Sequence, residues 1–206
     1  MRRFVVIGQT ATASGDFSLE DLPSTSGRLD VLLRCVRAAL LVSHGLRRDT
    51  VVYLVLLGGP LAPRTVRVDG AIATYVRPDE RSLAGLVRKV LATPRAGRDA
   101  GGPAFTPMPH GFAIAEGGLE LVLPDLGSFT PYLLDENAPD IRAAPLALED
   151  PVFFLGDHVG LDDATRARLA SAGAVSLSVG PVSVHADDVV AIVANELDRR
   201  APTVAL

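Results

Sequence analysis

Two adjacent units near the end of the chain constrain the fold more than any other feature. Each is a buried-strand pattern followed by a glycine turn and an amphipathic helix. The first has its strand and turn at 151–160, and Asp162 and Asp163 open its helix. The second has its strand and turn at 174–187 and its helix at 189–200. Apolar runs of this kind suit parallel strands covered on both faces, and glycines at their carboxyl ends let a ligand approach the backbone. The pattern predicts a small-molecule site.

Short apolar runs and helical patterns alternate along the rest of the chain. The predicted strands are Phe4–Ile7, Val51–Leu57, Gly111–Ala115 and Phe129–Leu134, and the predicted helices are Arg28–Val42, Leu83–Leu91 and a short one after the turn at 116–118. This alternation predicts an α/β fold, with a mostly parallel sheet and helices on both faces. With 206 residues and no break in composition, we expect one domain over 1–206.

One antiparallel edge is expected beside the parallel strands. Arg64–Val68 and Ala71–Val76 alternate in polarity around Asp69-Gly70, which is the pattern of a two-residue hairpin. The segments 9–16 and 95–109 contain polar residues, glycine and proline and are predicted to be loops.

Composition limits the kind of protein and its partners. No run of 18 apolar residues is present, which predicts a soluble protein of the cytoplasm without a membrane partner. The net charge of -4 disfavours extensive binding to a phosphate backbone, although arginines cluster at 28–37 and 81–88. These clusters fit either a local RNA-binding face or ordinary solvated helix faces. The single cysteine, Cys35, is expected to be a buried small hydrophobe.

Several separated segments, in order, are similar to one known family. They are Arg3–Gly8, Asp16–Pro23, Gly27–Cys35, Pro78–Ser82 and Asn195–Arg199, together with the two C-terminal units. The chain resembles the TrmY branch of the SPOUT-class RNA methyltransferases over nearly its whole length, most weakly between Arg95 and Phe112. The resemblance implies a C-terminal trefoil knot, S-adenosylmethionine as cofactor, a homodimer, and methylation of nitrogen 1 of pseudouridine at nucleotide 54 of the tRNA T-loop.

The resemblance also implies positions for the cofactor. They are Leu133, Gly156, Ser178, Val179, Gly180, Pro181, Val182, Ser183, Val184 and Val189. Two positions depart from the family pattern, because Gln9 stands where histidine is common and Val189 stands where cysteine is common. No metal is expected, and His158 and His185 are given no catalytic role.

Methylation of a ring nitrogen requires loss of its proton and stabilisation of the resulting anion. Asp30 and Arg28, at the start of the first long helix, fit the roles of proton acceptor and anion stabiliser. An equally open interpretation is that Asp30 and Arg34, spaced i and i+4, only pair along the helix. Asp79 and Glu80 are the next candidate carboxylates.

Three functions remain open at this point. The first is methylation of pseudouridine in the tRNA T-loop. The second is methylation of a free pseudouridine-like C-nucleoside, which the net acidity and the changed Gln9 and Val189 would fit. The third is a cofactor-binding or RNA-binding homologue without transfer activity.

Overall fold

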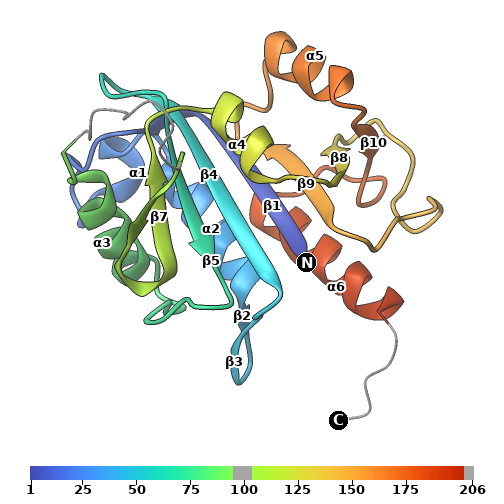
Figure 1. The fold of residues 1–206 in the computed structure, drawn as a ribbon, viewed down its shortest axis with the longest axis horizontal. Helices are drawn as coiled ribbons and strands as arrows, with labels where there is room; N and C mark the ends of the chain where they lie inside the picture. The colour runs from blue at the N-terminus through green and yellow to red at the C-terminus, as the bar shows by residue number, and fades with distance from the viewer. Residues whose placement is uncertain (95–103, 202–206) are drawn as a thin grey trace.

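The computed structural model describes residues 1–94 and 104–201 and has an eight-stranded sheet at its centre (Figure 1). The strands follow the order β10-β8-β9-β1-β4-β5-β7-β6. Their bounds are β1 Arg2–Thr12, β4 Thr50–Gly58, β5 Arg64–Asp69, β6 Thr106–Met108, β7 Phe112–Ala115, β8 Thr130–Leu134, β9 Pro151–Gly156 and β10 Val175–Leu177. A small separate hairpin joins β2 (Leu41–Val42) to β3 (Gly45–Leu46).

The sheet has a parallel part and an antiparallel edge. The five strands from β10 to β4 are parallel, and β5, β7 and β6 add antiparallel pairs beside β4. The central strands β1 and β9 are apolar and buried because helices cover both of their faces. The prediction of a mostly parallel α/β sheet is confirmed.

Helices cover both faces of the sheet (Figure 1). One face carries α1 (Leu22–Thr25), α2 (Leu29–Leu40), α3 (Glu80–Leu91) and α6 (Ala186–Arg200), and the other carries α4 (Leu119–Asp125) and α5 (Asp163–Ser171). A 3-10 turn, η1 (Pro109–Gly111), precedes β7. Side chains alternate along β1, so that Phe4 packs on the α2 side while Val5 packs on the α4 side.

Three predicted helices have different ends in the structure, and the one predicted at 189–200 begins at Ala186 as α6. The helix predicted over 28–42 ends at Leu40, because the chain turns there into the β2–β3 hairpin. The helix predicted from Leu83 begins at Glu80, since the Asp79 side chain accepts a hydrogen bond from the Ser82 amide at 2.7 Å and caps it.

The predicted hairpin around Asp69-Gly70 is wrong in its second half. Residues 71–76 form no strand, and β5 instead pairs with β4 and β7. The Arg48 guanidinium donates to the carbonyls of Gly70 at 2.9 Å and Ala73 at 3.1 Å, which holds this segment as a loop. Ala73 and Val76 are buried, whereas Ile72 and Tyr75 are exposed, so burial in this segment does not alternate as it would in a strand.

Three other predictions need correction. The segment predicted as a loop from Gln9 starts as strand, because β1 continues through an irregularity to Thr12, which pairs with Gly58. Within the second predicted loop, 106–108 is strand β6, and 95–103 lies outside the described residues. The last strand, β10, is a three-residue edge strand with Val175 exposed, so it is not buried on both faces. The knot and the single domain stay predictions.

In the described part of the chain no helix is both long and apolar enough to cross a membrane.

Candidate functional site

A cleft of about 390 Å³ lies at the carboxyl ends of β8, β9 and β10. Parallel strands end at the same edge of a sheet, so the loops that follow them meet there. The cleft is lined by Leu134–Asn137, residues 155–161, residues 177–180 and 182–184, and by Arg166, Ala186 and Val189. Its volume lies within the range of small-molecule sites, about 300–1,000 Å³.

The loop after β9 is fixed by a buried carboxylate. Asp157 accepts hydrogen bonds from the backbone amides of Gln9 at 2.9 Å and Val159 at 2.8 Å. The chain then returns so closely that a β-carbon on Gly156 would lie 2.5 Å from the carbonyl carbon of Gly160. Position 156 therefore requires glycine, and β9 is tied to the end of β1 beside the cleft.

The loop after β10 is fastened to the segment after β8. The Ser178 amide donates to the Pro139 carbonyl at 2.8 Å, and the Ser178 carbonyl accepts from the Ile141 amide at 2.8 Å. Gly180 follows with φ of 146°, and a β-carbon there would meet no atom within 4 Å. The backbone at Gly180 thus borders open space, into which a ligand fits.

Eight of the ten residues predicted for the cofactor line this cleft. They are Gly156, Ser178, Val179, Gly180, Val182, Ser183, Val184 and Val189. Leu133 does not line the cleft, because its side chain is buried in the core on the α4 side, and Leu134 takes that place. Pro181 is also absent from the lining and is exposed.

The strand end at Asp135-Glu136 is a cofactor candidate in the sequence, but its charged partner in the cleft, Arg166, was missed by the sequence analysis. Arg166 of α5 forms an ion pair with Asp135 after β8 and also donates to the Leu161 carbonyl at 3.3 Å. A hydrogen bond from the Asn137 amide lowers the pKa of Asp135 most, and the hydrogen bond from Arg166 lowers it further. The signal available in the sequence was Asp135 directly after a predicted strand, but nothing there indicated its partner.

Asp30 and Arg28 form a pair at the start of α2. Arg28 Nε donates to Asp30 Oδ1 and Arg28 Nη2 to Oδ2, both at 3.0 Å, while Arg34 Nη1 donates to Oδ2 at 2.9 Å. The Asp30 side chain is 2% exposed and that of Arg28 is 42% exposed. Burial alone would raise the pKa of Asp30, but the bonds from Arg28 and Arg34 outweigh it and lower the pKa.

Close backbone contacts place this pair near the end of β1. A β-carbon on Gly27 would lie 1.9 Å from the Thr10 carbonyl oxygen, and Thr10 Oγ1 donates to the Gly27 carbonyl at 2.9 Å. Gly27 has φ of 61° and Arg28 has φ of 66°, so the chain makes a left-handed turn into α2. This turn points the Arg28 side chain back toward Asp30.

One contact connects the pair to the cleft through Arg34, and others connect the neighbouring end of β1 to it. Arg34 Nε lies 3.7 Å from Asp187 Oδ2, in the first turn of α6 and next to the cleft residue Ala186. At the end of β1, Gln9 donates its amide to the cleft residue Asp157 and its side chain to Asp162 at 3.4 Å. The structure therefore brings the predicted cofactor and catalytic residues to one edge of the sheet.

Within 1–94 and 104–201, no group of three His, Cys, Asp or Glu side chains is arranged to hold a metal ion. His158 Nδ1 lies 3.8 Å from Asp157, and His185 Nδ1 lies 3.8 Å from Asp188, with the His185 side chain 90% exposed.

Comparison with known proteins places the chain in a family. A family model described as "Putative SAM-dependent RNA methyltransferase" matches residues 1–201. Two proteins named tRNA (pseudouridine(54)-N(1))-methyltransferase are similar over most of their length. The one from Methanosarcina acetivorans is 42% identical over 97% of this chain and 92% of its own. The one from Halobacterium salinarum is 43% identical over 96% of each chain.

A solved structure has a similar fold. It is Archaeoglobus fulgidus Nep1 bound to S-adenosylhomocysteine, with a TM-score of 0.64 and 15% identity over 96% of this chain and 97% of that one. At this identity the likeness concerns the fold. The fold match and the relatives confirm the resemblance on which the sequence-based expectation rested.

Proposed function

The chain belongs to the family of SAM-dependent RNA methyltransferases whose model spans residues 1–201, and from this membership we propose that it methylates nitrogen 1 of pseudouridine 54 in tRNA. The observation that carries the proposal is the position of the Arg28–Asp30 pair, which Arg34 and Asp187 connect to a cleft of cofactor size. Such an enzyme would act in the cytoplasm.

S-adenosylmethionine would lie in the cleft between the loops that follow β8, β9 and β10. Gly156 and Gly180 would let the backbone approach it, while Val184 and Val189 would contact it through apolar groups. When bound, the cofactor supplies a methyl group on a sulfonium, and the protein needs only to align the acceptor and exclude water.

Arg28 would stabilise the acceptor. The N1–H of pseudouridine loses its proton as the N1–methyl bond forms and the sulfur–methyl bond breaks, and the negative charge that builds up spreads onto the uracil oxygens. An exposed guanidinium held from behind by a carboxylate is well suited to donate to those oxygens.

Asp30 would hold Arg28 in place. The sequence-based alternative, that Asp30 accepts the proton, stays a prediction. Both Asp30 oxygens already accept bonds from arginines, and its lowered pKa makes it a weak base. We therefore propose that the N1 proton passes to water.

A homodimer is the proposed assembly. Val190, Val193 and Leu197 of α6 are buried inside the chain, so they leave no apolar surface for a partner. Val189 and Ile192 are only partly buried, and Ile192 borders a hollow with Asn195 and Arg199. This side of α6 is where a second copy would pack.

Methyl transfer to defined substrates tests the proposal. Radiolabelled S-adenosylmethionine is incubated with tRNA carrying pseudouridine at nucleotide 54, with the same tRNA carrying uridine there, and with free pseudouridine. Transfer only to the first supports the proposal. Transfer to the free nucleoside alone would favour the biosynthetic alternative, which the Gln9 and Val189 departures fit, and transfer to none would favour a homologue without activity.

A further inference from the structure

A separate hollow, of about 220 Å³, lies between α2 and the start of α3. We call it the arginine groove. It is lined by Leu33, Arg34, Arg37, Arg77, Pro78, Asp79, Glu80 and Leu83. Three arginines therefore line a space that is smaller than the cofactor cleft and is built from different elements.

Arg37 and Arg77 differ from Arg34 in the contacts of their side chains. Arg37 and Arg77 are exposed, and neither side chain makes a hydrogen bond or ion pair within the described residues 1–94 and 104–201. Arg34, in contrast, is bound to Asp30 at 2.9 Å and to Glu80 at 3.5 Å. Arg37 and Arg77 are free to bind an anion.

Both carboxylates of the groove already interact with other groups of the protein. Asp79 caps α3 through the Ser82 amide. Hydrogen bonding to the Ser82 side chain and then to its amide lowers the pKa of Asp79, and the charge of Arg77 contributes less. Glu80 lies 3.5 Å from Arg34. An incoming anion at Arg37 and Arg77 would therefore meet carboxylates that are partly neutralised.

Arg34 connects the groove to the proposed reaction site. It lines the groove, binds Asp30, which holds Arg28, and approaches Asp187 beside the cleft. A strand whose target base enters the cleft beside Arg28 would continue along α2 and pass over Arg37.

We propose that the arginine groove binds backbone phosphates of the RNA strand next to the methylated nucleotide, with Arg37 and Arg77 as the direct contacts. This inference rests on the proposed function. Guanidinium groups bind phosphate oxygens through paired, charge-assisted hydrogen bonds, and two of them in one groove would fix the direction of the strand. The groove therefore supplies affinity for RNA that a free nucleoside cannot use.

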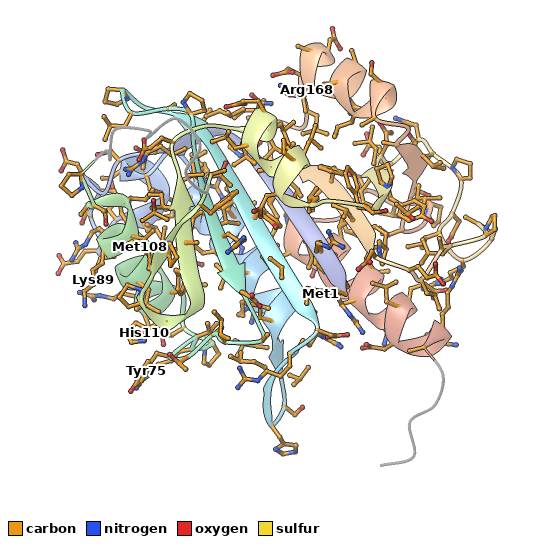
Figure 2. All side chains as sticks on the ribbon, in the orientation of Figure 1. Met1, Tyr75, Lys89, Met108, His110 and Arg168 are labelled. Atoms are coloured by element: carbon orange, nitrogen blue, oxygen red, sulfur yellow. The ribbon has the colours of Figure 1, made fainter. Side chains whose placement is uncertain are left out.

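Arg37→Gln, Arg77→Gln and the double variant test the inference. Arg168→Gln is the matched control, because Arg168 is an exposed arginine of α5. It lies on the opposite side of the molecule from α3, the helix that borders the groove and carries the labelled Lys89 (Figure 2). Binding of a T-arm RNA oligonucleotide is measured by fluorescence anisotropy over a range of salt concentrations. Thermal unfolding and calorimetry with S-adenosylhomocysteine check the fold and the cleft.

Each groove substitution should weaken RNA binding about tenfold, the value of a charge-assisted hydrogen bond. The slope of log affinity against log salt should fall by about 0.7–0.9 per lost phosphate contact. In the groove variants, KM for the oligonucleotide should rise with kcat unchanged, and the affinity for S-adenosylhomocysteine should equal that of the wild type. The Arg168→Gln variant should equal the wild type in all of these measurements. Wild-type affinity and salt slope in the double variant would overturn the inference.

The outcomes separate this inference from the proposed function. If the wild type methylates the RNA and the groove variants behave like it, the function stands and the groove is not a phosphate site. If the wild type binds RNA through Arg37 and Arg77 but transfers no methyl group, the groove stands and the proposed function is wrong.

Discussion

Asp30 accepts one hydrogen bond on each carboxylate oxygen from the same Arg28 guanidinium, Nε to Oδ1 and Nη2 to Oδ2, both at 3.0 Å. This paired contact fixes the plane of the guanidinium. It also leaves the carboxylate little capacity to accept a proton from a substrate.

A double-mutant cycle distinguishes a positioning role for Asp30 from that of a base. Asp30→Asn alone should lower the methyl-transfer rate about 10–100-fold, because Arg28 loses its fixed orientation. In an Arg28→Gln background the same change should have little further effect, since the residue through which Asp30 acts is gone. Rates are measured at saturating S-adenosylmethionine. An undiminished effect of Asp30→Asn in the Arg28→Gln background would instead identify Asp30 as the proton acceptor.

The same carboxylate should make stability depend on pH in the acid range. Its pKa is lowered in the folded protein, so the unfolded state binds a proton first as the pH falls. The stabilisation is complete above the unfolded value, about 3.9, and is lost as the pH falls through the folded value. Urea unfolding between pH 7 and pH 3 should give Asp30→Asn a shallower loss of stability below pH 4 than the wild type. At pH 7 the variant should be less stable by about 1–3 kcal/mol. If stability falls equally steeply below pH 4 in the variant and the wild type, Asp30 is not the source of this pH dependence.

The cofactor cleft could be located from the sequence because it depends on local patterns. The apolar run at 151–155 followed by Gly156 predicts a strand end, and parallel strands bring such ends together. The side of the strand that faces the cleft was harder to predict. Leu133 and Leu134 are both apolar, and only the strand pairing decides which of them is buried in the core.

The charged network could be predicted only in part. The i, i+4 spacing indicates the Asp30–Arg34 pair, which the structure contains. The Arg28–Asp30 contact, at i and i+2, depends on the left-handed backbone of Arg28, and Arg166–Asp135 joins residues that are 31 positions apart. Residues 71–76 illustrate the opposite error, in which the sequence predicts an element that the structure lacks. The sequence pattern of this segment is typical of a strand, but hydrogen bonds from Arg48 hold the segment as a loop.

The thiol of Cys35 should be unreactive in the folded protein. Its side chain is fully buried in α2, and burial raises the pKa of the thiol, so both access and thiolate formation are suppressed. Alkylation by iodoacetamide should be slow in native buffer and rapid in denaturant, as followed by mass spectrometry. Rapid labelling in native buffer would mean that α2 opens locally without global unfolding.

The proposed dimer should depend on the outer side of α6. Ile192→Asp would place a charge on this partly buried position and should shift the protein toward a monomer at micromolar concentration. Ala170→Asp, at an exposed position of α5, is the control and should leave the mass unchanged. Light scattering coupled to size exclusion measures both. A monomeric wild type would contradict the dimer.

Two glycine substitutions should separate folding of the cleft from binding in it. Gly156→Ala places a β-carbon 2.5 Å from the Gly160 carbonyl carbon, so the loop after β9 must move, and both thermal stability and affinity for S-adenosylhomocysteine should fall. Gly180→Ala meets no protein atom within 4 Å and carries only the strain of φ at 146°, on the order of 1–3 kcal/mol. Its main effect should therefore be on the ligand that occupies the space. Calorimetry should show at least a tenfold loss of affinity in Gly180→Ala, with smaller loss of thermal stability than in Gly156→Ala. Wild-type affinity in Gly180→Ala would place the cofactor away from this loop.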